Sequence, residues 1–185
     1  MKSLDMSSVQ EAGSSRALPA GGYICKITKV EDVVDKEYLY IEYDVAEGPY
    51  KDYYKDLEAT KGFWGGKCYR SYKEAALPMF KRFCSAVTKS NPGYIFDGGT
   101  QNADETTLKG KMIGIVFGEE EYIKNNGDTG RRLYVSYECD VEKIRQHNYT
   151  PAKFKSLNGA NADAPAAKVD LTIDAPEGID ELPFK

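Results

Sequence analysis

The chain has 185 residues, 41% of them hydrophobic, and a formal net charge of −4 at pH 7. This length allows one domain, or one domain with a tail. No run of about 18 apolar residues occurs, so the sequence predicts no membrane span. Residues 170–185 hold five carboxylates against Lys185 alone, which accounts for the whole net charge and leaves the body neutral. A neutral body attracts phosphates weakly at long range, so any nucleic-acid binding must depend on local patches and on ring stacking.

Neither the cysteines nor the short motifs point to an enzyme. The four cysteines are widely spaced without a C-x-x-C pair, and residues 1–16 are polar and lack an apolar export signal. These features predict reduced cysteines and a cytoplasmic protein. His147 has no cysteine at ligand spacing, so we expect no metal site. Phosphate-binding glycine loops and a G-x-S-x-G elbow are also missing, which predicts a non-enzymatic protein without a cofactor.

The first third of the chain predicts three strands after a flexible lead over residues 1–17. Near-alternation with β-branched residues marks a strand over residues 23–32, and strict alternation marks another over residues 38–45. The second strand has an inner face of Leu39, Ile41, Tyr43 and Val45 and an outer face of Tyr38, Tyr40, Glu42 and Asp44. Gly48-Pro49 then breaks the run, and a third strand is expected over residues 50–57, with Tyr53 and Tyr54.

A glycine-rich aromatic loop, one helix and two further strands are expected next. The loop covers residues 61–70, KGFWGGKCYR, and Ser71 and Glu74 have the spacing of a capping box. Apolar residues recur at helical spacing before a stop at Asn91-Pro92-Gly93; they are Phe80, Phe83, Cys84 and Val87. After a long loop, strands are predicted over residues 111–123 and 131–141, joined by a turn at Asn126-Gly127. Alternation places four residues of the last strand on one face: Leu133, Val135, Tyr137 and Cys139. Beyond residue 149 the composition is that of a linker.

The resulting order, three strands, a helix and two strands, is that of an OB-fold. The fold class is therefore mainly β with one helix: a five-stranded OB-fold barrel over residues 18–149, followed by a flexible C-terminal tail over residues 150–185. A split α+β sandwich would use the same elements. An OB-fold binds oligonucleotides or oligosaccharides on the face of its second and third strands and on two flanking loops.

The tyrosines have two interpretations. They favour the half-buried surface of a sheet, but exposed rings also form stacking platforms for bases. Rings for stacking, together with cations for phosphates, are what sequence-tolerant binding of single-stranded DNA requires. The candidate DNA-binding residues come from the second and third strands, the loop and the last hairpin: Tyr38, Tyr40, Tyr53, Tyr54, Phe63, Trp64, Lys67, Tyr69, Arg70, Tyr122, Lys124, Arg131 and Arg132. Glu42 and Asp44 share the tyrosine face and would repel phosphates near the path.

The C-terminal end combines acidic residues with a short apolar tip. An apolar tip on an acidic tail is typical of a docking peptide, in which the ring enters a pocket and the acids meet basic residues. The residues are Asp180, Glu181, Leu182, Pro183 and Phe184. This end resembles the acidic tip of bacterial single-stranded DNA-binding proteins, which ends in Ile-Pro-Phe and recruits replication and repair enzymes. It departs from that tip at Lys185, because in that family the terminal carboxylate of the phenylalanine is itself recognised.

The body resembles a family of phage and prophage proteins that are thought to bind single-stranded DNA. The matching stretches are residues 18–23 (LPAGGY), 44–50 (DVAEGPY), 79–83 (MFKRF) and the region from Gly110-Lys111 to Glu121-Tyr122. The resemblance implies an OB-fold, binding and protection of single-stranded DNA in phage replication or recombination, and a location in the bacterial host cytoplasm. It also implies replication or recombination proteins as partners of the tail. A homodimer is among the expected assemblies, because single-strand binders with one barrel often pair. The alternatives are a phage module that binds a host protein through the barrel face and, on fold analogy alone, oligosaccharide binding.

Overall fold

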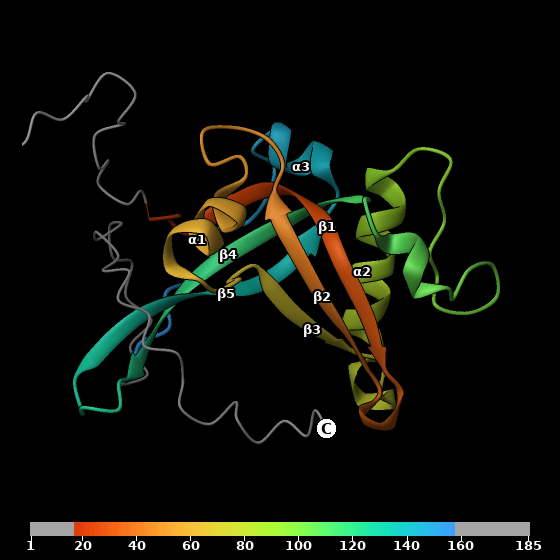
Figure 1. The fold of residues 1–185 in the computed structure, drawn as a ribbon. Helices are drawn as coiled ribbons and strands as arrows, with labels where there is room; N and C mark the ends of the chain where they lie inside the picture. The colour runs from red at the N-terminus through yellow and green to blue at the C-terminus, as the bar shows by residue number, and fades with distance from the viewer. Residues whose placement is uncertain (1–16, 158–185) are drawn as a thin grey trace, which may run out of the picture.

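The computed structural model describes residues 17–157, which form a five-stranded antiparallel sheet with helices packed around it (Figure 1). The sheet has the order β3-β2-β1-β4-β5 and is not closed, so β3 and β5 are its two edges. The strands are β1 (Gly21–Val33), β2 (Tyr38–Val45), β3 (Lys67–Ser71), β4 (Met112–Ile123) and β5 (Thr129–Cys139). The prediction of a mainly β protein with five strands is confirmed.

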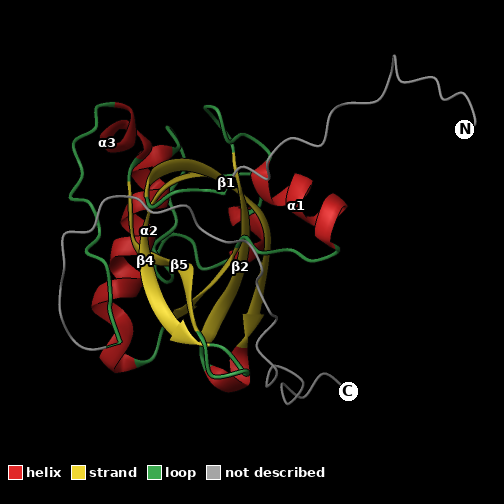
Figure 2. Cartoon of the chain, turned by 90° about the vertical axis from the view of Figure 1, so that its left-hand side faces the viewer, coloured by secondary structure: helices red, strands yellow, loops and turns green. Residues whose placement is uncertain are grey.

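Three α-helices accompany the sheet, where the sequence predicted one. They are α1 (Tyr53–Lys61), α2 (Leu77–Ser90) and α3 (Val141–Arg145), and short 3-10 turns occupy Val34–Lys36, Glu74–Ala76 and Glu105–Leu108. The sheet curls; α1 and α2 bury side chains in the main core on its inner face, whereas α3 packs on a second cluster on the other face. In Figure 2, α2 and α3 are seen at the left of the sheet and α1 at the right. Among residues 17–157 no helix has the length and hydrophobicity that a membrane span needs.

The predicted third strand over residues 50–57 is wrong, because this stretch turns into helix α1. Its tyrosines suggested a strand, but Lys55, Leu57, Glu58 and Ala59 are good helix formers and prevail. The third strand is instead β3, and all but its last residue lie in the segment predicted as a loop. It is only five residues long and directly follows Gly65-Gly66. The alternation of so short a segment is a weak signal, and the two glycines favoured a loop.

Helix α2 matches the predicted apolar pattern but not the predicted cap. It buries Phe80, Phe83, Cys84 and Val87, has Pro78 in its first turn and ends at Ser90. Ser71 is the last residue of β3, and its hydroxyl donates to the Glu37 carbonyl and accepts from the Lys73 amide. It therefore caps no helix, and the helix begins without a side-chain cap.

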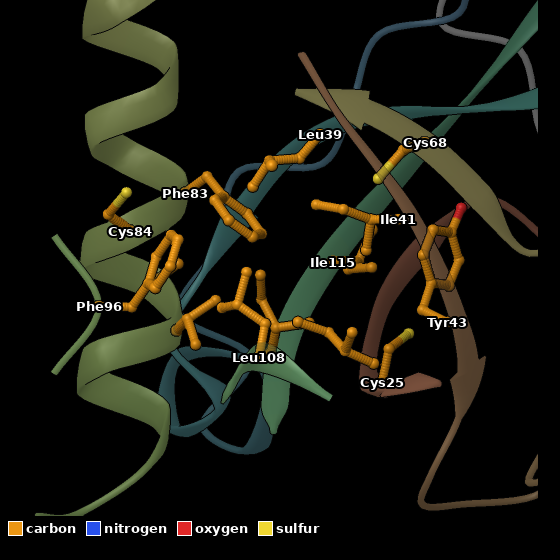
Figure 3. Close-up of a cluster of buried hydrophobic side chains, with 14 of the residues drawn as sticks. Cys25, Leu39, Ile41, Tyr43, Cys68, Phe83, Cys84, Phe96, Leu108 and Ile115 are labelled. Atoms are coloured by element: carbon orange, nitrogen blue, oxygen red, sulfur yellow. The ribbon is translucent and has the colours of Figure 1, made fainter. Parts of the chain in front are cut away.

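The main core lies between the inner face of the sheet and α2. In Figure 3, Phe83 from α2 and Phe96 from the following loop point toward Leu39, Ile41 and Ile115 of the strands. Leu39, Ile41, Tyr43 and Val45 are all buried, which confirms the predicted inner face of the second strand. The strict period of two in β2 is thus the signal that places its outer residues on the opposite face.

All four cysteines are free and buried. Burial raises the pKa of the Cys68 thiol to about 12, and the pKa values of Cys84 and Cys139 to about 11. These thiols are therefore protonated at neutral pH and have little nucleophilic character.

A β-bulge at Ser136 reverses the predicted faces in the second half of β5. Val116 of β4 is opposite Tyr137 and Phe117 is opposite Val135, so Ser136 is the extra residue. Leu133 and Val135 pack on the main core, whereas Tyr137 and Cys139 join a second cluster on the other face of the sheet. The prediction that these four residues share one face is therefore wrong.

The same bulge turns Glu138 toward β3, where it forms an ion pair with Arg70. This pair connects the two edge strands of the open sheet, and Glu138 is buried, with 4% of its surface exposed. Helix α2 contacts β3, β4 and β5 and so covers the gap between these edges. Arg70 thus has a structural role in joining β3 to β5.

Residues 150–157, which the sequence placed in the linker, run back along the sheet. Lys155 forms a parallel bridge with Glu120 of β4, and its amide donates to the Glu119 carbonyl. The Tyr134 hydroxyl donates to the Lys153 carbonyl, and the Lys155 ammonium lies 3.5 Å from the centroid of the Tyr134 ring. This segment therefore covers part of the β4–β5 hairpin.

Gly66 occupies a position where a side chain would collide with the backbone. A Cβ atom there would lie 2.2 Å from the Tyr43 carbonyl oxygen and 2.6 Å from the Tyr54 ring. We expect Gly66→Ala to lower the free energy of unfolding by about 1–3 kcal/mol or more, because β3 must shift away from β2. Gly99→Ala is the matched control, since no atom lies within 4 Å of its Cβ, and should stay within about 0.5 kcal/mol of wild type. Urea unfolding compares the two; equal stabilities would contradict the close packing at Gly66.

Candidate nucleic-acid interface

Three tyrosine rings form a contiguous group on the outer face of β2 and β3. Tyr40 is directly opposite Tyr69 in the strand register, and Tyr38 is two residues along the same face of β2. The Tyr69 ring centroid lies 5.4 Å from that of Tyr38 and 5.5 Å from that of Tyr40. Tyr69 is 44% exposed, and Tyr38 and Tyr40 are half-buried. We call Tyr38, Tyr40 and Tyr69 the tyrosine platform; it offers aromatic surface to a ligand at the β3 edge.

The two acids of this face are held in different ways. Asp44 is buried. Its carboxylate accepts hydrogen bonds from the Tyr54 amide at 2.8 Å and from the Lys55 amide at 3.2 Å. It therefore caps the first turn of α1. This role was not predicted from the sequence, because residues 50–57 were expected to form a strand. Glu42 remains on the face and accepts a hydrogen bond of 2.7 Å from the Tyr40 hydroxyl. Of these two acids, Glu42 alone is thus left beside the rings to repel a phosphate.

Two lysines flank Glu42 on the neighbouring strands. Lys29 of β1 and Lys67 of β3 are its cross-strand partners, and both are exposed. The Lys29 ammonium lies 5.3 Å from the Tyr40 ring centroid and 3.5 Å from the Glu31 carboxylate. Lys29 was not among the predicted site residues, although the alternation of the first strand puts it on the outer face once the bulge between Ile27 and Lys29 is known. Two lysines and two glutamates therefore leave the platform close to neutral.

The glycine-rich segment contributes less to this face than expected. Tyr69 and Lys67 belong to it, but Arg70 points inward to Glu138. Trp64 packs against the core, and its indole N–H donates to the Gly66 carbonyl at 2.9 Å. Phe63, 36% exposed, precedes the strand. Arg70 and Trp64 therefore cannot contact a ligand on this face. Tyr69 and Lys67 are the residues of this segment that lie exposed beside Tyr40.

Tyr53 and Tyr54 are packing residues of α1. Tyr54 is 6% exposed and contacts the rings of Tyr43 and Trp64. Tyr53 is half-buried, and its ring lies 5.1 Å from that of Tyr54. Because α1 replaces the expected strand, these rings do not extend the platform.

The last hairpin carries its four predicted residues far from the platform. The β4–β5 turn lies at the lower left of Figure 1, whereas the β1–β2 turn, next to Tyr38, lies at the lower right. The Arg132 guanidinium lies over the Tyr122 ring and donates to Glu120 at 2.9 Å.

Arg131, on the opposite face of the hairpin, lies 3.9 Å from Glu119 and 4.9 Å from the Phe154 ring centroid. Lys124 is near the turn, where its amide donates to the Asp128 carbonyl. Both arginines are thus paired with carboxylates, and the predicted single surface of three sets is not formed.

The docking residues Asp180, Glu181, Leu182, Pro183 and Phe184 and most of the lead lie outside the described residues. Within residues 17–157, no three histidine, cysteine or acidic side chains gather in a way that could hold a metal ion. Neither the protein-family models nor the curated proteins compared with this chain give a significant match.

Proposed function

We propose that this protein binds single-stranded DNA in a sequence-tolerant manner, with an OB-fold barrel as the binding body. The sheet order β3-β2-β1-β4-β5, with α2 between β3 and β4, supports a partly open barrel of this kind. The observation that carries the proposal is the tyrosine platform, three adjoining rings on the outer face of the second and third strands. That is the face an OB-fold uses for oligonucleotides, and every base has a π-face that such rings can stack on.

The near-neutral charge of this face determines how binding should behave. Lys29 and Lys67 are balanced by Glu31 and Glu42, so stacking supplies more of the affinity than long-range attraction does. When a protein contacts few phosphates, its affinity falls only gently as the salt concentration is raised. A sequence-tolerant binder should also prefer a single strand to a duplex, in which the bases are already stacked.

Fluorescence anisotropy of labelled oligo-dT tests the proposal directly. A labelled oligonucleotide is preferable to the emission of Trp64, because that indole packs on the core and away from the platform. We expect saturable binding at micromolar protein in low salt, with weaker binding to a duplex of the same length. No binding under these conditions would refute DNA binding by this chain.

The C-terminal end gives the proposal its second part: recruitment of replication or recombination proteins in a phage-infected bacterial cell. Truncation after residue 169 removes a net charge of −4. The affinity for oligo-dT should stay the same or rise up to several-fold at low salt, because a competing anionic segment is lost. Capture of host replication proteins should be lost, as it should in Phe184→Ala with the charge intact. Weaker DNA binding after truncation would contradict a docking role.

The balanced charge of the platform also favours one alternative, a protein partner covering the same rings. Tyrosine is enriched at protein interfaces, and neutral aromatic patches suit them. In this case oligo-dT would not bind, and alanine at Tyr69 would abolish partner capture instead.

A further inference from the structure

A second candidate site lies on another part of the molecule, in a cleft between α2, the end of β5 and α3. Its volume is about 620 Å³, which is within the usual range for small-molecule sites. Arg82 and Lys89 come from α2, Tyr137 from β5, and Lys143 from α3. We call this the α2–α3 cleft. The sequence alone did not single out these cations, because Lys143 lies more than 50 residues beyond Arg82 and Lys89 along the chain.

The positive charge of the α2–α3 cleft is not neutralised by the protein. Arg82, Lys89 and Lys143 form no ion pair with any carboxylate among residues 17–157, unlike Arg131 and Arg132 of the hairpin. Two acids also line the cleft, but they are engaged. Glu138 pairs with Arg70, and the Asp140 carboxylate accepts from the Lys143 amide at the start of α3. The cleft therefore holds three cations and one carboxylate, that of Asp140, that has no cationic partner.

Arg82 is also held in place. Its guanidinium lies 5.6 Å from the centroid of the Tyr137 ring. That ring is fixed at its far end, since the Tyr137 hydroxyl donates to the Thr150 carbonyl at 2.8 Å and accepts from the Thr150 amide at 2.9 Å. A guanidinium resting on an aromatic face keeps its N–H groups free at the edge, where a phosphate can accept two hydrogen bonds.

We propose that the α2–α3 cleft binds a phosphate group, with Arg82, Lys89 and Lys143 as its ligands. Arg82 supplies a planar, bidentate donor and the two lysines supply mobile charge, a combination that suits a phosphate. The phosphate has two possible sources, the backbone of a bound nucleic acid or a free nucleotide. The first rests on the proposed function, and the second is independent of it.

The test compares two double variants that remove equal charge. Arg82→Gln/Lys89→Gln changes the cleft, and Lys73→Gln/Lys81→Gln removes two exposed lysines that do not line it. Calorimetry with thymidine 5′-monophosphate and with inorganic phosphate measures the free-ligand arm. Anisotropy of oligo-dT across a salt series measures the nucleic-acid arm. Circular dichroism establishes that both variants are folded.

If the backbone supplies the phosphate, the cleft variant should lower the slope of log affinity against log salt by about 0.7, since the cleft holds one phosphate and each single-strand phosphate contact contributes about 0.7. The control should leave that slope nearly unchanged. If a free nucleotide is the ligand, wild type and control should bind thymidine monophosphate and the cleft variant should lose at least tenfold in affinity. This result stands even if oligo-dT does not bind, which would refute the proposed function alone. Equal behaviour of the two variants in both arms would overturn the cleft proposal.

Discussion

Replacing Tyr40 and Tyr69 together by alanine should weaken the binding of oligo-dT by roughly 30-fold or more. Each base stacked on a ring contributes about 1–3 kcal/mol, and each 1.4 kcal/mol is a factor of ten in affinity. The two residues are cross-strand partners with ring centroids 5.5 Å apart, so their loss removes the centre of the platform. Neither lies in the buried core, so the fold should persist. Anisotropy titration at fixed salt measures the change.

Two controls separate stacking from other effects. The double variant Tyr40→Phe/Tyr69→Phe retains both rings and should bind within a few-fold of wild type, although it loses the hydrogen bond from Tyr40 to Glu42. Phe63→Ala removes an exposed ring outside the platform and should have little effect. If the folded alanine variant binds as wild type does, the platform is not the DNA site.

Replacing Glu138 by alanine should lower the free energy of unfolding by about 3–5 kcal/mol, because it leaves a charged partner without compensation in a poorly solvated place. The side chain of Arg70 is only 18% exposed and pairs with this carboxylate across the two edge strands. Its guanidinium also donates to the Tyr69 carbonyl, so the disturbance should reach the platform strand. Urea unfolding of the full chain measures the loss.

The comparison pair lies on the surface of the β4–β5 hairpin. Arg132→Ala breaks the ion pair between Arg132 and Glu120, whose two side chains are 51% and 21% exposed, respectively. This variant should lower the free energy of unfolding by at most about 1 kcal/mol. The double variant Arg70→Met/Glu138→Leu should recover most of the lost stability, because apolar side chains of similar volume need no partner charge. If Glu138→Ala and Arg132→Ala cost the same, the pair does not join the edges.

Much of the sheet could be predicted because its strands are long and regular. Alternation placed β2 and its buried face correctly, and apolar spacing found α2. The errors fall on short or irregular pieces. The edge strand β3 has five residues beside two glycines, and the tyrosines of α1 suggested a strand where helix formers prevailed.

The candidate site was predicted only in part, for a similar reason. Tyr38, Tyr40, Tyr69 and Lys67 do share one face. Alternation placed Tyr38 and Tyr40 on it, whereas Tyr69 and Lys67 were expected on a loop and reach it through β3. Tyr54 and Trp64 were assigned to the same surface but pack inward, because α1 and the Gly66 turn bring them to the core. Whether an aromatic ring is buried depends on what packs against it, which a residue list does not state.

The sequence by itself determined the mainly β class, the faces of its regular strands, the position of the main helix, and a charge balance with the acidity at the end of the chain. Only the tertiary structure decided which charges remain unpaired. Arg70 pairs with Glu138 across 68 positions of the chain, whereas the side chains of Arg82 and Lys143 form no ion pair with any carboxylate among the described residues. The physical reason is that an ion pair needs two charges within about 4 Å, and one bulged residue, Ser136, turns Glu138 to the face where Arg70 lies.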